Sequence, residues 1–269
     1  MRILIASDME GVSGIVKWEQ VEGGEALYEE GRRLYTEEIN AAVRGAKAAG
    51  ATEIVVMDCH GAGKGWTFNS LVPELLDPDC EWVVQDEWSD YTGALEAGCE
   101  AALLVGMHAK AGSARGVMSH TVSGRDYRDL RFNGVSVGET GINAALCGVW
   151  SCPVVLVTGD DVVCEEATEL LGAELVTVQV KEGLGRESAR NLAPVRARAL
   201  IEAGAKEGIA KRDRVPPYDP GTPCEIEVTF ASPDLTDRFR FRHGVEITGP
   251  LTIVSRAEDW LTAWQQFFF

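Results

Sequence analysis

The sequence has few of the patterns that thiolate metal sites, secretion and membrane insertion require. It holds seven cysteines, an odd number, and no two of them form a CxxC pair, which excludes a zinc ribbon and a thioredoxin-like motif. No run of about 18 apolar residues occurs, so no membrane-spanning helix is expected. Asp8 interrupts the apolar residues 3–6 too early for a signal peptide. We therefore expect a cytoplasmic protein with reduced thiols.

Basic residues are also scarce. The chain of 269 residues has 25 Lys and Arg against 42 Asp and Glu, a formal net charge of −17. Such a surface repels phosphate backbones and anionic lipids, so we expect neither nucleic acid nor membranes as partners. It favours cations instead, such as metal ions or substrates that carry an amine. The length suits one large α/β domain, or a main domain with a smaller one.

Short apolar runs alternate with helical patterns, which is typical of a parallel sheet with crossover helices. The expected strands are Ile3–Ser7, Glu53–Met57, Trp82–Gln85, Ala101–Gly106 and Pro153–Thr158. Between the first two, apolar residues recur at helical spacing over Glu25–Ala49, and Gly50 follows as a helix-ending glycine. The sequence predicts an α/β fold, with an open, mostly parallel sheet and helices on both of its faces.

An antiparallel insertion is expected in the middle of the chain. Val117–Val137 alternates around Asn133-Gly134, a dipeptide typical of a type I′ hairpin turn. We expect this insertion to overhang the edge of the parallel sheet. It is followed by a predicted helix over Glu139–Val149.

The last third of the chain has a different pattern, with a helix over Val195–Lys211 followed by a turn-rich stretch. Strands are expected around Glu225–Phe230 and Leu251–Ser255, before a final amphipathic helix. We therefore expect an α/β domain over residues 1–185 and a smaller α+β lobe over residues 186–269.

Metal-ligating residue types stand at the carboxyl ends of three predicted strands. Asp8 and Glu10 follow the first strand, in SDMEG. His60 follows the second, in DCHG, and His108 follows the fourth, in GMHA. The carboxyl ends of parallel strands meet at one edge of a sheet, so these four side chains are expected to converge. Asp8 and Glu10 share a face if the first strand continues through them.

Glu139, in VGETGIN, is a fifth candidate. It lies in the first turn of a predicted helix, where the helix dipole favours a carboxylate. Two imidazoles with two or three carboxylates suit zinc or another transition metal. Five side chains exceed the three that a single catalytic zinc ion normally takes, so the surplus indicates two ions bridged by a carboxylate.

The sequence alone leaves the roles of the other two histidines more open. His120 lies in the antiparallel insertion, and from the residues alone it is a sixth ligand, a proton-transfer group or a surface residue. His243 follows an alternating run of arginines, and we expect it at the surface.

Two other functions compete with a metal-dependent enzyme. Residues 134–138 read GVSVG, which fits the G-x-S-x-G pattern of a serine hydrolase of the α/β-hydrolase type, with Ser136 as nucleophile. Asp160 or Asp161 and then His243 follow in the matching order. The context opposes this function, because the pattern lies in a predicted hairpin and a nucleophile elbow joins a buried strand to a helix. The other alternative is a non-catalytic protein that binds metal or peptides.

Five motifs in collinear order resemble one known family. They are SDMEG at 7–11, DCHG at 58–61, GMHA at 106–109, GVMSH at 116–120 and VGETGIN at 137–143. The set is similar to the D-aminopeptidases of peptidase family M55, once described as dipeptide-transport proteins. The resemblance covers about residues 1–180 and is loose beyond about residue 190.

This resemblance implies a zinc-dependent aminopeptidase that releases N-terminal D-amino acids, chiefly D-alanine, from short peptides by metal-activated water. It implies two Zn²⁺ per chain, with other divalent transition metals able to replace them, and His120 as the catalytic group. The implied metal ligands are Asp8, Glu10, His60, His108 and Glu139. It also implies a cytoplasmic homodecamer, and it makes residues 1–185 the metal-binding catalytic domain.

Overall fold

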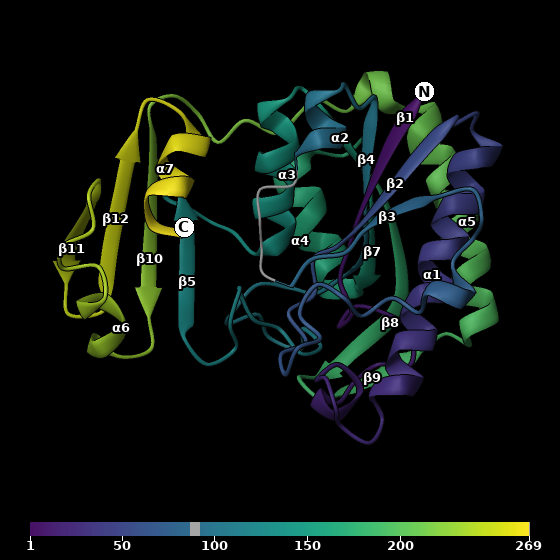
Figure 1. The fold of residues 1–269 in the computed structure, drawn as a ribbon, viewed down its shortest axis with the longest axis horizontal. Helices are drawn as coiled ribbons and strands as arrows, with labels where there is room; N and C mark the ends of the chain where they lie inside the picture. The colour runs from purple at the N-terminus through teal and green to yellow at the C-terminus, as the bar shows by residue number, and fades with distance from the viewer. Residues whose placement is uncertain (87–91, 269) are drawn as a thin grey trace.

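The computed structural model describes residues 1–86 and 92–268, which form two sheets (Figure 1). The larger sheet has seven strands in the order β3-β2-β1-β4-β7-β8-β9. These are β1 (Arg2–Ser7), β2 (Glu53–Asp58), β3 (Glu81–Val83), β4 (Ala101–Met107), β7 (Val154–Asp160), β8 (Val176–Gly185) and β9 (Ser188–Asn191). All neighbouring strands are parallel except β8 and β9, which form an antiparallel hairpin at one edge. The predicted α/β class is confirmed.

The central strands are apolar on both sides because both faces of the sheet are covered. In β1, Ile3 and Ile5 are buried in the core on one face, whereas Leu4 and Ala6 are buried in the core on the other. Successive side chains of a strand point to opposite faces, so a continuous apolar run is what a doubly covered strand requires. The predicted strand at Trp82–Gln85 is shorter and begins earlier, at Glu81–Val83.

Helices cover the two faces of this sheet (Figure 1). On one face lie α1 (Tyr28–Ala48) and α5 (Pro194–Ala210), which pack against each other. On the other lie α2 (Gly93–Glu96), α3 (Glu139–Val149) and α4 (Asp161–Leu171). The predicted helix over Glu139–Val149 coincides with α3, and those over Glu25–Ala49 and Val195–Lys211 agree with α1 and α5 to within a few residues.

The smaller sheet is antiparallel and has the order β11-β12-β10-β5-β6. Its strands are β5 (Tyr127–Phe132), β6 (Val135–Ser136), β10 (Cys224–Phe230), β11 (Val245–Gly249) and β12 (Thr252–Ala257), with α6 (Pro233–Asp237) and α7 (Trp260–Phe268) beside them. Three short 3₁₀ helices, η1 (Trp18–Gln20), η2 (Pro73–Leu75) and η3 (Arg212–Arg214), lie in the connections. The helix α7 packs against β10, β12 and α3, so it links the smaller sheet to the larger one.

The position of the antiparallel insertion corrects one expectation. Only residues 127–136 form the hairpin, β5 and β6, and Val117–Asp126 is an irregular loop. The hairpin does not overhang the parallel sheet, because β5 pairs with β10 and so belongs to the smaller sheet. Buried apolar residues on alternate positions of both strands, such as Phe132 and Ile226, favour this pairing.

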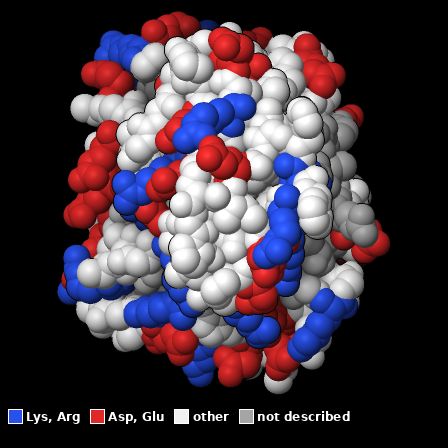
Figure 2. Space-filling view, turned by 90° about the vertical axis from the view of Figure 1, so that its left-hand side faces the viewer, with Lys and Arg blue, Asp and Glu red and all other residues white. Residues whose placement is uncertain are grey.

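The side of the molecule on which β11 lies carries few charges at its centre. Figure 2 shows this side of the molecule, with uncharged side chains in the middle and side chains of both charge signs around them. In the described part of the chain, the helices are all too short or too polar to cross a membrane.

The strand order places a crevice between β1 and β4. From β1 the chain proceeds through β2 to β3 on one side, and from β4 it proceeds through β7 to β8 on the other. Ligands of open α/β sheets bind outside the carboxyl ends of the strands at such a reversal of strand order. Asp8 follows β1 directly and His108 follows β4 directly, so both stand at this position.

Candidate metal centre

The first acidic pair lies in a tight turn at the end of β1. The strand ends at Ser7, so it does not continue through Asp8 and Glu10 as the expectation of a shared strand face requires. The turn instead passes against β4, with the Gly11 N–H donating to the carbonyl oxygen of Gly106 at 2.8 Å. Gly106 has φ +76, and a Cβ there would come within 2.1 Å of the Asp8 carbonyl oxygen. This close approach directs both acidic side chains to the same place.

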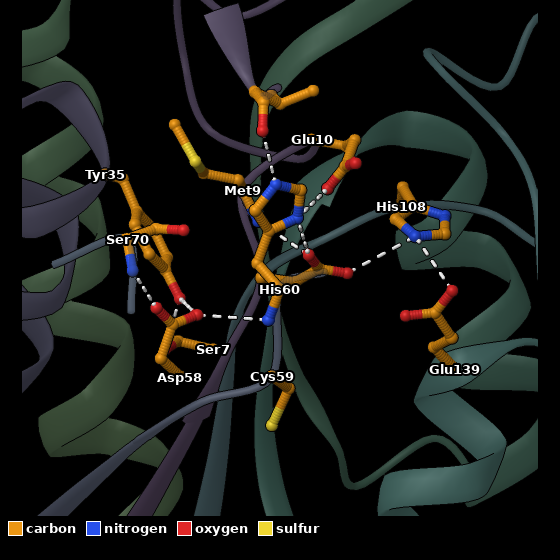
Figure 3. Close-up of polar contacts among 12 residues, drawn as sticks. Ser7, Met9, Glu10, Tyr35, Asp58, Cys59, His60, Ser70, His108 and Glu139 are labelled. Atoms are coloured by element: carbon orange, nitrogen blue, oxygen red, sulfur yellow. Dashed lines mark hydrogen bonds and ion pairs between the residues drawn. The ribbon is translucent and has the colours of Figure 1, made fainter. Parts of the chain in front are cut away.

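His60 faces both carboxylates of this turn. Its Nδ1 lies 3.1 Å from Asp8 Oδ1 and 3.1 Å from Glu10 Oε2. Its other ring nitrogen, Nε2, lies 2.8 Å from the carbonyl oxygen of Val21 and donates to it. Because a carbonyl oxygen can only accept, Nε2 keeps its proton on Val21, and Nδ1 is the nitrogen that faces the two carboxylates. Figure 3 shows the ring beside Glu10, with the main-chain nitrogen of His60 toward Asp58.

His108 repeats the same arrangement on the other side of Asp8. Its Nδ1 donates to the carbonyl oxygen of Ala109 at 3.0 Å. Its Nε2 then points to Asp8 Oδ2 and to Glu139 Oε1, each at 3.3 Å (Figure 3). Glu139 is the first residue of α3, and its Oε1 also accepts from the Val122 N–H at 2.8 Å. Asp8 thus contacts both histidines, one with each oxygen.

His120 stands beside this group, in the loop before β5 and not on a strand. Its Nδ1 donates to the Met118 carbonyl oxygen at 2.8 Å, and its Nε2 lies 3.6 Å from Glu139 Oε1. Its ring stacks on the His108 ring with centroids 3.9 Å apart, and the Trp18 ring meets it edge-on at 5.8 Å. All three histidines therefore hold one nitrogen on a backbone carbonyl and turn the other toward carboxylates.

This donor set fits divalent cations. Asp8 Oδ2, Glu10 Oε2 and His108 Nε2 are buried and, within residues 1–86 and 92–268, have no hydrogen-bond partner. Their residues form one group whose ligand atoms lie within 4.8 Å of one another, and a second such group comprises His108, His120 and Glu139. Buried polar atoms without partners are costly, and metal-ligating histidines ordinarily donate their second ring nitrogen to a backbone carbonyl or carboxylate. Mixed nitrogen and oxygen ligands suit zinc.

Electrostatics favour positive charge at the same place. Burial raises the pKa of the Asp8 carboxyl, but the facing imidazoles of His108 and His60 hold it well below its usual range. Burial lowers the pKa of both histidines, but the facing carboxylates hold it well above the usual range, chiefly Glu10 for His60 and Glu139 for His108. The site therefore keeps its carboxylates ionised and attracts a cation to the nitrogens between them.

Buried groups behind the candidate ligands keep them in place. Asp58, the last residue of β2, accepts hydrogen bonds from the His60 N–H and the Tyr35 hydroxyl, both at 3.0 Å. Lys181 of β8 is 1% exposed, and its Nζ donates to the carbonyl oxygens of Glu10, Val12 and Ile15 at 2.5, 3.0 and 2.7 Å. Burial lowers the pKa of Lys181 to about 8. The Lys181 ammonium thus fixes the conformation of the loop that carries Glu10.

A cavity of about 770 Å³ opens onto the ligands. Its lining includes Asp8, Glu10, His60, His120 and Glu139 from the predicted set. Aromatic and apolar side chains form much of the remainder, namely Trp18, Phe68, Ile142, Leu146, Trp260, Trp264 and Phe268. Two arginines, Arg125 and Arg186, also line it. A cleft of this size, apolar with a few polar groups, is typical of a small-molecule or peptide site.

The structure brings together all six residues singled out for the site, and it adds others that the sequence did not indicate. Trp18, Lys181 and Arg186 reach the site from segments far apart in the chain, and the aromatic residues of α7 come from the smaller lobe. The hydrophobic run around Trp260 and Trp264 signalled only a buried helix face. Among these added residues, only Lys181 is recognisable from its local sequence, because it is a charged residue within an apolar strand pattern.

The arrangement opposes a serine hydrolase. Ser136 Oγ donates to Asp129 Oδ1 at 2.6 Å, within the smaller sheet. Of the two candidate triad acids, Asp160 caps α4 by accepting from the Val163 N–H and also accepts from Val117, and Asp161 accepts from the Gly183 N–H. His243 is exposed, as expected. A cysteine nucleophile is opposed as well, because burial raises the pKa of the Cys59 thiol in the cavity wall well above its usual range.

Comparisons with known proteins agree with the geometry. The model of the family described as D-aminopeptidase, peptidase M55, matches residues 1–269. A D-aminopeptidase from Bacillus subtilis (strain 168) is 33% identical over 268 residues, covering 98% of this chain and 94% of that protein. A solved structure described as the Zn-dependent D-aminopeptidase DppA from Bacillus subtilis, a self-compartmentalizing protease, matches with a TM-score of 0.89 and 31% identity. That match covers 100% of this chain and 96% of the other.

Proposed function

Because this chain belongs to the D-aminopeptidase family M55, we propose that it is a zinc-dependent aminopeptidase that releases N-terminal D-amino acids, chiefly D-alanine, from short peptides. One observation carries this proposal. The imidazoles of His60 and His108 each hold one nitrogen on a backbone carbonyl and turn the other toward buried carboxylates. The zinc dependence stated for the similar solved structure supports zinc as the ion.

The proposed site would hold two zinc ions. Both ions would share Asp8 as a ligand, because its two oxygens face different histidines. The other proposed ligands are Glu10 and His60 on one side and His108 and Glu139 on the other. Bound zinc ions would supply Lewis-acid chemistry, polarising the scissile carbonyl and lowering the pKa of a coordinated water.

His120 is the proposed catalytic group. It lines the cavity, and its Nε2 lies next to Glu139 while Nδ1 stays on the Met118 carbonyl. An imidazole fixed in this way can take a proton from the attacking water or give one to the leaving amine. It comes from a loop and not from a strand end, which separates it from the five ligands.

The cavity also suits a peptide with a free amino terminus. Carboxylates of Asp8, Glu10, Glu22 and Glu139 line it and attract the substrate's ammonium group. Residues 1–185, the proposed catalytic domain, contain all the proposed ligands. In the proposed lobe 186–269, β9 and α5 pack with the larger sheet, and α7 adds the aromatic wall of the cavity.

We propose further that the protein acts in the cytoplasm as a homodecamer. The similar solved structure is described as a self-compartmentalizing protease, which is a property of an assembly. Large apolar side chains on this chain remain exposed, among them Val195 at 76% and Phe241 at 95%. Exposed apolar residues of this size are candidates for subunit contacts. Light scattering coupled to gel filtration measures the assembly directly.

The experiment for the activity compares enantiomers. Zinc-loaded protein is incubated with D-Ala-Gly and with L-Ala-Gly, and released alanine is measured. The proposal expects hydrolysis of the D-peptide with the L-peptide at least about 100-fold slower. Equal rates, or a preference for the L-peptide, contradict it.

A further inference from the structure

Two arginines stand on the rim of the acidic cavity. Arg186 lies in the turn between β8 and β9, and Arg125 lies in the loop before β5. Over residues 1–86 and 92–268, neither guanidinium forms an ion pair. By contrast, Lys64 in the same cavity pairs with Glu25, and Arg190 on the same hairpin as Arg186 pairs with Glu182. The chain has a net charge of −17, so acidic side chains are abundant. Two arginines at the rim of the cavity that form no ion pair with the described residues therefore remain able to bind an anionic group of a ligand.

Arg186 is exposed, and two contacts orient its guanidinium. Its guanidinium lies over the Trp18 ring, 5.2 Å from the centroid, and its Nε donates to the Ser119 carbonyl oxygen at 3.3 Å. Its own carbonyl oxygen accepts from the Met118 N–H at 2.7 Å. These contacts use one side of the guanidinium and leave Nη1 and Nη2 for a ligand. An arginine fork fixed in this way matches the two oxygens of a carboxylate.

The fork also lies close to the proposed catalytic histidine. A Cβ on Gly124 would be 3.4 Å from Arg186 Nη2 and 3.7 Å from His120 Cβ, so both flank the same glycine. His120 in turn stacks on the ligand His108. One extended residue spans about 3.3–3.6 Å, so a short peptide is long enough to reach from His120 to the fork.

We propose that Arg186, assisted by Arg125, binds the C-terminal carboxylate of the substrate and so restricts the enzyme to short peptides with a free C-terminus. This inference rests on the proposed aminopeptidase function. The substrate's ammonium group then lies toward the acidic ligands, and its carboxylate lies toward the arginines. In longer peptides the C-terminal carboxylate lies too far from the amino terminus to reach the arginines. C-terminal amides have no negative charge at this position.

Arg186 has an alternative role that the test must separate. Through Trp18 and Ser119 it also contacts the surroundings of His120, and these contacts alone would give it a positioning role. A positioning role affects every substrate equally. Carboxylate binding affects only the substrate that carries the carboxylate, and it acts mainly on KM.

The experiment measures kcat/KM for D-Ala-Gly and for its C-terminal amide, with wild type, Arg186→Gln and the control Arg190→Gln. A hydrogen-bonded charge pair corresponds to about 10–100-fold in affinity, so wild type and control should prefer the acid by at least about 10-fold. Arg186→Gln should lose most of that preference, with the amide changed less than about threefold. Equal rates for acid and amide in wild type, or an equal loss for both in Arg186→Gln, overturn the inference.

A binding measurement keeps the inference testable if no hydrolysis occurs. Calorimetry with the reduced-bond analogue of D-Ala-Gly, as acid and as amide, is independent of turnover. Tighter binding of the acid in wild type but not in Arg186→Gln supports carboxylate recognition, and equal binding of the two forms overturns it. Failure of the zinc-loaded wild type to cleave any D-alanyl peptide would contradict the proposed function separately.

Discussion

The imidazole rings of His108 and His120 stack with their centroids 3.9 Å apart and their planes 13° from parallel. Each ring donates its Nδ1 proton to a backbone carbonyl, and each turns Nε2 toward Glu139. The two residues nevertheless differ in origin, because His108 ends a buried strand and His120 lies in a loop. This difference separates a proposed ligand from a proposed proton carrier.

Replacing His120 by Ala should lower kcat while leaving the bound metal in place. General acid–base groups contribute typically about 10²–10⁴-fold, so we expect kcat to fall by that factor with little change in KM. Steady-state kinetics and zinc content per chain measure the two effects, with exposed His243→Ala as the control. Loss of one zinc ion would make His120 a sixth ligand, and an effect under about threefold would remove it from the mechanism.

Replacing Asp8 by Asn should be among the most damaging single changes. Asp8 faces His60 with one oxygen and His108 with the other, so a neutral amide weakens both proposed ion sites. We expect kcat to fall by more than about 10³-fold and the zinc content to drop. Asp213→Asn, at an exposed position, is the control. A variant that kept two ions per chain would contradict the bridging role.

Replacing Lys181 by Met should loosen the loop that carries Glu10. The change removes the Lys181 donor from three carbonyl oxygens, of which Val12 keeps the Ile15 N–H, and each buried group left unsatisfied costs about 1–3 kcal/mol. We expect the free energy of unfolding to fall by about 2–4 kcal/mol and zinc affinity to fall about 10–100-fold. Urea denaturation and zinc titration measure these changes, with exposed Lys206→Met for comparison. Unchanged zinc affinity would show that the loop holds its shape without the ammonium.

Glu38 should make stability depend on pH. Burial raises its pKa from 4.5 to about 7, although the Ser13 N–H and nearby Lys181 and Arg198 oppose the shift. Because the folded-state pKa lies above the unfolded one, the buried acid loses its proton at a cost, and stability falls as pH rises from about 4.5 to 7. Relative to wild type, Glu38→Gln should therefore gain up to about 3 kcal/mol between pH 5 and pH 8.

Urea denaturation at the two pH values measures this difference, and exposed Glu165→Gln serves as the control. The histidines of the site titrate in both proteins, so their contribution cancels in the comparison. A constant difference between Glu38→Gln and wild type across this range would mean that Glu38 titrates normally.

The strand ends of the site were predictable because they follow from local sequence. A parallel sheet brings the residues after β1, β2 and β4 to one edge, so Asp8, His60 and His108 could be grouped without knowing any contact. The geometry of Asp8 and Glu10 was not predictable in the same way. The turn at Glu10 depends on the approach of Gly106 in another strand and on Lys181 of β8.

Long-range pairings were the main part that the sequence could not provide. The turn dipeptide Asn133-Gly134 predicts a hairpin, but it carries no information on whether that hairpin pairs with the parallel sheet or with β10. Arg186 meets Trp18 only because the β8–β9 hairpin folds over the loop after β1. Such contacts depend on tertiary packing and not on any pattern within a segment.

Metal dependence of D-alanyl peptide hydrolysis tests the central claim most directly. The protein is stripped with a chelator and titrated with zinc while D-Ala-Gly hydrolysis and bound zinc are followed together. The account predicts no activity in the stripped protein, and activity that rises with bound zinc to a plateau at two ions per chain. Full activity in the stripped protein, with inactivation by a serine-directed phosphonate that labels Ser136, would contradict it.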